Sequence, residues 1–244
     1  MHAAQPPDWI RDAIERAREE AWKYVATGVA FTLRPGRFAS TWIEGRERAL
    51  NPFAILATGA GVLGVARALL DLIVSRSAGT QGLLEAMRDG VAPFAHYAVL
   101  GALCHLVLRA IWSRRRLSDS IAMSLFAGGG PGVASTLIVY AAGVALWIVA
   151  GRPDVVHGGL LGSLPQYAAR PLLWTAYAGY GLFLGTLMLS LRALHGVSIW
   201  KASLALAVAV FAVGVLFGLK PGDVAFGTRV LVRFHPLRAS IWVD

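Results

Sequence analysis

The sequence predicts an all-α fold: a polytopic transmembrane helical bundle of about five spans, preceded by an N-terminal amphipathic interfacial helix. Among the 244 residues, 56% are hydrophobic and only 15% are charged, whereas a soluble domain carries about 25% charged residues. The apolar residues gather into runs long enough to cross a hydrocarbon core of about 30 Å. Lys and Arg stand mainly at the ends of these runs, where the positive-inside rule places them. The net charge of +9 therefore does not indicate nucleic acid, which needs basic residues along a soluble groove.

This pattern divides the chain into three regions. Residues 1–51 are expected to form cytosolic amphipathic and interfacial helices, residues 52–219 the five-span transmembrane domain, and residues 220–244 a basic C-terminal tail. The spans are expected at residues 53–74, 92–112, 133–150, 171–191 and 202–219. In the tail, polar and apolar residues alternate over residues 228–234, which predicts a short strand.

The N-terminal helix is expected over residues 8–32. Its apolar side chains fall on one stripe at helical spacing, and they are Ile10, Ile14, Ala17, Ala21 and Val25. Arg16–Glu20 and Glu19–Lys23 are i,i+4 pairs on the polar face. Such a helix can lie on the membrane, pack on a partner, or cover the cytosolic face of its own chain. A turn at residues 34–37 and a short helix at residues 38–50, with Trp42 and Ile43 facing lipid, should follow.

The third apolar stretch, residues 120–150, contains a run of small residues and a proline. This run is Gly128, Gly129, Gly130, Pro131 and Gly132, and it is expected to break the helix. Irregular backbone at membrane depth is tolerated only where protein buries it or where it lines water. The break is therefore expected to be a re-entrant feature or to lie at the interface, with a short interfacial helix before it and a span after it.

Orientation follows from the distribution of Lys and Arg. Fourteen of these residues fall in the segments on the N-terminal side of the membrane and eight on the opposite side. This excess predicts a cytoplasmic N-terminus and a C-terminus on the far side. The basic tail disagrees with this count, and a four-span arrangement with a re-entrant third or fifth run would place the tail inside.

Two features of the spans concern polar pairing and helix packing. Arg67 and Asp71 lie four residues apart in the first span, so they can neutralise each other as a structural pair or mark an ion pathway. Small residues recur at four-residue spacing, which allows close helix approach, either within the bundle or in a homo-oligomer or partner interface. These packing positions are Ala60, Gly64 and Ala68, then Gly181 and Gly185, and then Gly214 and Gly218.

The titratable residues give no catalytic constellation. His96 and His105 are nine residues apart on opposite sides of one helix, so they cannot share a metal. Each is either an axial ligand of a tetrapyrrole or a hydrogen-bond partner of a neighbouring helix. His195 and the remaining histidines are assigned to separate loops and termini, and Cys104 is the only cysteine. Nucleophilic and phosphate-binding motifs are absent from the sequence, so we expect no enzyme activity, no metal and no cofactor.

Two stretches carry a family resemblance. One comprises residues 102–109 (ALCHLVLR), residues 117–120 (LSDS) and the Gly130-Pro131 pair, and the other is residues 191–202 (LRALHGVSIWKA). Together they resemble the YIP family, the Ypt-interacting-protein-like five-span membrane domains, including its bacterial relatives. The resemblance covers about residues 33–219. It implies a helical bundle with a cytosolic N-terminus and a far-side C-terminus that serves membrane organisation, trafficking or complex assembly without catalysis. We expect the chain to be integral to the bacterial inner membrane.

Three functions remain open on these grounds. The first is a non-catalytic membrane scaffold or accessory subunit that contacts lipid and either a membrane protein partner or a second copy. The second is a small transporter or channel component that uses Gly128–Gly132 and the Arg67–Asp71 pair as a pathway. The third is a pigment- or haem-binding subunit that uses His96 or His105 as its ligand.

Overall fold

The computed structural model describes residues 8–45, 49–75, 96–110, 114–151 and 164–216, and every regular element in these ranges is a helix. The predicted all-α class is confirmed. Four helical segments in the described part are long and apolar enough to cross a membrane, namely residues Pro52–Leu70, Leu117–Val149, Tyr167–His195 and Ile199–Leu216. The chain is therefore an integral membrane protein. The expected second span is represented by the helix His96–Ala110, which is about 22 Å long at 1.5 Å per residue; the outer residues of that span lie outside the described ranges.

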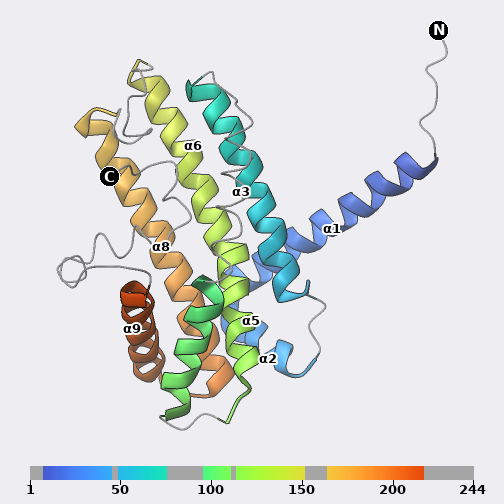
Figure 1. Ribbon diagram of the computed structural model, residues 1–244, viewed down its shortest axis with the longest axis vertical. Helices are drawn as coiled ribbons and strands as arrows, with labels where there is room; N and C mark the ends of the chain where they lie inside the picture. Colours follow the sequence, from blue (N-terminus) through green and yellow to red (C-terminus); the bar gives the residue numbers. More distant parts are fainter. Residues whose placement is uncertain (1–7, 46–48, 76–95, 111–113, 152–163, 217–244) are drawn as a thin grey trace.

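The long helices form an elongated bundle (Figure 1). Helices α3 (Pro52–Ser75), α6 (Val133–Val149) and α8 (Gln166–His195) run side by side along its long axis. Helix α8 is the central element, because it packs against α2 (Pro35–Ile43), α5 (Leu117–Ala127), α6 and α9 (Ile199–Leu216). It also begins earlier than expected, at Gln166 within the predicted loop, since Pro165 stands just before its first turn, where proline is well tolerated.

The predicted helix break at Gly128, Gly129, Gly130, Pro131 and Gly132 is wrong. These residues form a π-helical turn, η1 (Gly128–Gly132), which joins α5 to α6 in one continuous helix over Leu117–Val149. All five residues are buried, and the continuous helix through them does not turn back. Glycine and proline weaken an isolated helix, but here neighbouring helices enclose the turn and side chains satisfy its carbonyl groups, as lipid-embedded backbone requires.

Three hydroxyl groups donate hydrogen bonds to carbonyl groups of the π-helical turn. The Tyr24 hydroxyl donates a hydrogen bond to the carbonyl oxygen of Gly129 at 2.7 Å. Ser135 donates to the carbonyl oxygen of Pro131 at 2.7 Å, and Thr136 donates to that of Gly132 at 2.9 Å. Ser135 and Thr136 follow the glycine run by one helical turn, so they reach back to it along their own helix.

The helices of the N-terminal region are fastened to the bundle by aromatic side chains. The ring of Phe126 on α5 lies 5.9 Å from Phe31 of α1 (Asp8–Leu33), 4.9 Å from Phe38 and 5.1 Å from Trp42, between ring centroids. Phe31, Phe38 and Phe126 are almost completely buried. Trp42 therefore packs on the core rather than facing lipid as expected, and α2 ends at Ile43 rather than continuing to residue 50.

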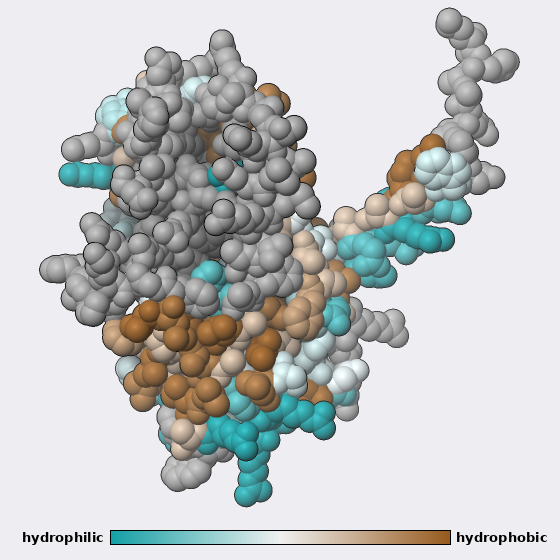
Figure 2. Space-filling view, viewed as in Figure 1, coloured by the Kyte–Doolittle hydropathy of each residue, from teal (hydrophilic) through white to brown (hydrophobic). Residues whose placement is uncertain are grey.

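Large apolar side chains remain exposed over the outside of the spanning helices. On α9, for example, Leu204, Phe211 and Val215 are each at least half exposed, and Figure 2 shows an apolar surface over this part of the bundle. A contiguous exposed apolar surface on a soluble protein would mark an interaction site. On helices of spanning length it is the surface that acyl chains cover.

Candidate functional site

The turn between α8 and α9 brings together side chains from three helices at one end of the bundle. Helix α8 ends at His195, and Gly196 adopts a left-handed conformation with φ of 62°. The amide of Val197 then donates to the carbonyl oxygen of Arg192 at 3.2 Å, the bond that closes a Schellman motif. This tight cap fixes His195 in the last helical turn, where it points into the bundle.

His195 forms a hydrogen-bonded cluster with Ser120 of α5 and His105 of the helix His96–Ala110. The Ser120 hydroxyl lies 2.9 Å from Nε2 of His195 and 3.1 Å from Nδ1 of His105. The two imidazole rings are 5.7 Å apart between centroids. A hydroxyl has one proton to donate, so with both rings neutral Ser120 donates to one imidazole and accepts an N–H from the other.

This cluster connects helices rather than presenting a reactive group. Ser120 is 0% exposed and His105 only 2% exposed, so a substrate cannot reach the hydroxyl that a nucleophilic mechanism would use. Buried polar groups that are mutually satisfied fix the register of the helices that carry them. The cluster therefore holds the His96–Ala110 helix, α5 and the end of α8 in one arrangement.

Sequence reasoning missed the role of His195, because the interval between the expected spans at residues 171–191 and 202–219 placed it in a loop. The signal for its true position was Gly196, since glycine is the preferred residue just after a helix C-terminus. His105 hydrogen-bonds a neighbouring helix, one of the two roles foreseen for it. His96 lines a void of about 10 Å³ beside Tyr97 and Tyr180, which has room for about one water and none for a tetrapyrrole.

A basic groove lies beside this cluster, between α2 and the C-terminal end of α8. It has a volume of about 490 Å³, and its lining includes Arg34, Arg37, Leu189, Arg192 and Val197. A second hollow of about 320 Å³ shares Arg34 and Arg37 with it. The guanidinium groups of Arg34, Arg37 and Arg192 form no ion pair or hydrogen bond with the described residues.

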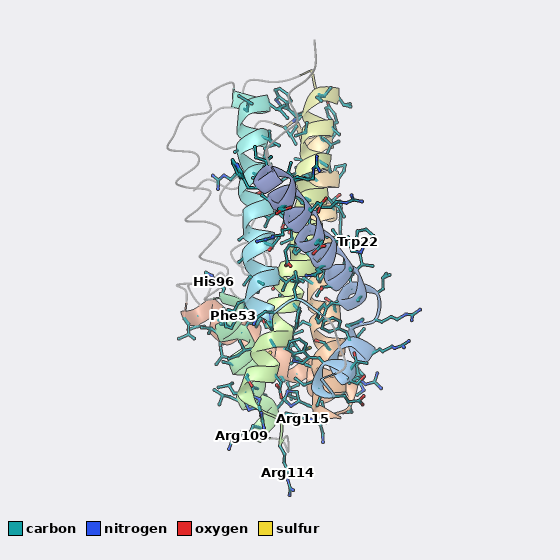
Figure 3. All side chains as sticks on the ribbon, turned by 90° about the vertical axis from the view of Figure 1, so that its right-hand side faces the viewer. Trp22, Phe53, His96, Arg109, Arg114 and Arg115 are labelled. Atoms are coloured by element: carbon teal, nitrogen blue, oxygen red, sulfur yellow. The ribbon has the colours of Figure 1, made fainter. Side chains whose placement is uncertain are left out.

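The surrounding surface is also basic. Figure 3 places Arg109, Arg114 and Arg115 together at the lower end of the bundle, and Figure 2 shows this end as a hydrophilic area below the apolar surface. His105 lies one helical turn before Arg109, so the histidine cluster sits just inside this end. The arrangement can attract anions, and among the described residues that line the groove none is acidic.

The other predicted sites are only partly described. Arg67 is partly buried on α3, but the side chain of Asp71 lies outside the described part, so their pairing stays a prediction. Ala60, Gly64 and Ala68 are partly buried on α3 and Gly214 is buried on α9, whereas Gly218 lies outside the described residues. A Cβ atom at Gly181 or Gly185 would meet nothing described within 4 Å, so this pair does not pack within the described bundle.

Close helix contacts lie instead at glycines that the sequence analysis did not select as packing positions. A Cβ atom on Gly129 would lie 2.8 Å from the backbone carbonyl of Ile55 on α3. Where α1 crosses η1, the Cα of Gly130 would be 3.6 Å from a Cβ on Gly28. These contacts are between segments far apart in the chain, and spacing within one helix gives no sign of them.

The first half of α1 extends away from the bundle (Figure 1). Only the second half, with Tyr24, Thr27 and Phe31, contacts the described core. Trp9 is 71% exposed, Ile14 61% and Trp22 72%, and Figure 2 shows apolar and charged side chains on different faces of this segment. Within the described structure, residues 9–23 therefore do not cover the cytosolic face of their own chain, which was one of the three roles expected for this helix.

Comparison of the chain with protein-family models, with curated proteins and with solved structures gave no match.

Proposed function

We propose that the protein is a non-catalytic integral membrane scaffold or accessory subunit, and that residues 9–23 of α1 recruit a protein partner. The observation that supports this proposal is the exposed apolar stripe on the extended half of α1, where Ile14 is 61% exposed. An amphipathic helix gains its stability by burying such a stripe. The described bundle leaves this stripe uncovered, and a partner protein would bury it.

The charges on this segment favour a protein over a lipid surface. Helices that lie on membranes carry mainly Lys and Arg on the polar face, because the headgroups of the cytoplasmic leaflet are anionic. Here the polar face has four basic and four acidic side chains: Arg11, Arg16, Arg18 and Lys23, and Asp12, Glu15, Glu19 and Glu20. A balanced set of charges suits ion pairs and specificity at the rim of a protein interface.

We further propose that this scaffold resides in the bacterial inner membrane with its N-terminus in the cytoplasm, as a YIP-type protein. The basic end of the bundle, with Arg109, Arg114 and Arg115, supports a cytoplasmic location for that end under the positive-inside rule. The two stretches that carry the resemblance meet at the hydrogen-bonded cluster of His105, Ser120 and His195. Their meeting supports a shared structural role for these stretches.

A transporter receives less support. The Gly128–Gly132 segment foreseen as part of a pathway is buried, and its carbonyl groups at Gly129, Pro131 and Gly132 are occupied by hydroxyl donors. A permeation pathway needs backbone or side-chain groups that face water. The geometry at this turn is that of helix packing.

Site-specific photo-crosslinking tests the proposal. A photoreactive amino acid at Ile14 lies on the apolar stripe, and the same group at Asp12 lies on the opposite face, because residues two apart do not face the same way on a helix. We expect one discrete protein adduct from position 14 in native membranes and none from position 12. Adducts to lipid alone, or equal protein adducts from both positions, would contradict partner recruitment by this stripe.

A further inference from the structure

The groove between α2 and α8 concentrates positive charge without neutralising it. Arg34, Arg37 and Arg192 line the same space of about 490 Å³, and each is exposed. None of them has an ion-pair partner among the described residues. Three cations held around one groove repel each other, so an anion bound between them lowers the electrostatic energy of this region.

The backbone adds a second attraction for an anion. Helix α2 begins at Pro35, its N-terminus carries no side-chain cap, and its first residues Pro35, Gly36 and Arg37 line the groove. Pro35 has no N–H, so the amides of Gly36 and Arg37 are the ones without an intrahelical acceptor, and the helix dipole makes this end electropositive. Arg192 lies in the last turn of α8, where its charge already interacts favourably with the helix dipole. Arg34 and Arg37 are therefore the pair more available to bind an anion.

The position of the groove indicates the source of the anion. Trp200, at the start of α9 and just past the turn that ends α8, is 81% exposed, and exposed tryptophans favour the headgroup zone of a bilayer. Leu189 lies one helical turn before Arg192 on α8, nearer the middle of the spanning segment. It lines the groove and is 36% exposed. The hollow that shares Arg34 and Arg37 has Leu33 and Phe38 in its lining. Cationic groups thus lie at headgroup level with apolar wall on the side of the acyl chains.

We propose that this groove binds the phosphate of an anionic phospholipid. Arg34, Arg37 and Arg192 hold the phosphate oxygens, since a planar guanidinium pairs with phosphate in a bidentate geometry. Leu189 and Val197 contact the glycerol backbone and the first methylene groups. The site is independent of partner recruitment by α1, because it uses none of residues 9–23.

Native mass spectrometry of the full chain in detergent tests this proposal. The probes are phosphatidylglycerol and phosphatidylcholine with identical acyl chains, and the variants are Arg37→Gln and Arg192→Gln. Arg114→Gln is the matched control, because Arg114 is exposed at the same end of the bundle but does not line the groove. We expect tight binding of one phosphatidylglycerol and an apparent Kd about tenfold weaker in each groove variant, as for loss of one charge-assisted hydrogen bond. The control should bind as the native chain does.

Three results would overturn the proposal. Equal binding of phosphatidylcholine would show that the anionic headgroup is not recognised. An equal loss in Arg114→Gln would show attraction by the general surface charge. Complete displacement of the lipid by millimolar inorganic phosphate would identify a free-anion site instead. Unchanged thermal unfolding of the groove variants, which change only exposed side chains, supports reading their Kd as a binding effect.

Discussion

The hydroxyl of Tyr24 donates a 2.7 Å hydrogen bond to the carbonyl oxygen of Gly129, which lies 105 residues further along the chain. This bond joins the amphipathic helix α1 to the π-helical turn inside the longest candidate span. Gly59 of α3 lies at the same point, since a Cβ on it would approach both the Gly129 oxygen and the Tyr24 hydroxyl. The junction of α1, α3 and η1 is therefore one of the places where the N-terminal region joins the bundle.

Loss of this hydrogen bond should loosen α1. In Tyr24→Phe the Gly129 carbonyl loses its hydroxyl donor, and the loss of a typical intramolecular hydrogen bond costs about 0.5–1.5 kcal/mol. We expect a lower thermal unfolding midpoint in detergent and faster proteolysis within α1. Tyr167→Phe serves as the control, because Tyr167 is 67% exposed, and this variant should unfold as the native chain does. Equal effects of the two changes would show that the Tyr24 hydrogen bond does not stabilise the docking of α1.

The same residue makes docking of α1 sensitive to alkaline pH. Burial raises the pKa of the Tyr24 phenol from 10.0 to about 12. A group whose pKa is higher in the folded state stabilises that state below the unfolded pKa, and this contribution is lost as pH rises through the folded pKa. The difference in unfolding midpoint between the native chain and Tyr24→Phe should therefore be constant below pH 9 or so and shrink between about pH 10 and 12. A difference that stays constant over that interval would disagree with a buried, protonated Tyr24.

Close packing at the π-helical turn should make Gly129 intolerant of any side chain. In Gly129→Ala the new methyl group would lie 2.8 Å from backbone atoms of Ile55 and 2.9 Å from the Cα of Leu56, and backbone cannot move aside as a flexible side chain does. Overpacking of this kind costs about 1–3 kcal/mol or more. Thermal unfolding in detergent measures the loss.

Gly181→Ala is the matched control for this change. Gly181 is also helical, but nothing described lies within 4 Å of its Cβ position, and alanine has the higher helix propensity by about 1 kcal/mol. We expect an unchanged or slightly higher unfolding midpoint. A larger loss in Gly181→Ala than in Gly129→Ala would reverse the assignment of the tight contact.

The histidine cluster should depend on the hydroxyl at its centre. Ser120→Ala removes a hydrogen-bond partner of both His105 and His195, and the loss of a typical intramolecular hydrogen bond costs about 0.5–1.5 kcal/mol. We expect a reduced unfolding midpoint and faster hydrogen exchange in the last turn of α8. Ser118 is an exposed position on the same helix, so Ser118→Ala should leave both quantities unchanged. Indistinguishable behaviour of the two variants would show that the histidine cluster does not stabilise the fold.

Spanning helices could be predicted because their signal is local. The apolar runs at residues 53–74 and 202–219 correspond to α3 and α9 to within a few residues, since length and hydropathy alone decide whether a segment crosses a bilayer. The amphipathic helix at residues 8–32 was likewise predicted from its stripe and pairs, and α1 covers Asp8–Leu33.

The features that failed or were missed depend on contacts between distant segments. The run at Gly128–Gly132 has the composition of a break, but it stays helical because Tyr24, Ile55 and Tyr97 from other helices enclose it. His195 has no polar neighbour in sequence that reveals Ser120 and His105. The arginine groove likewise joins residues 34 and 37 to residue 192, and no pattern within either segment shows that they meet.

The most direct test of recruitment by α1 is purification of the tagged full chain from its native membranes, compared with Ile14→Asp. The substitution places a charge on the exposed apolar stripe and leaves the contacts of Tyr24 and Phe31 with the bundle intact. We expect a single stoichiometric partner, the protein crosslinked from position 14, to accompany the native chain and the control Asp12→Asn. This partner should be lost from Ile14→Asp at an unchanged unfolding midpoint. Retention of that partner by Ile14→Asp would rule out recruitment through the apolar stripe of α1.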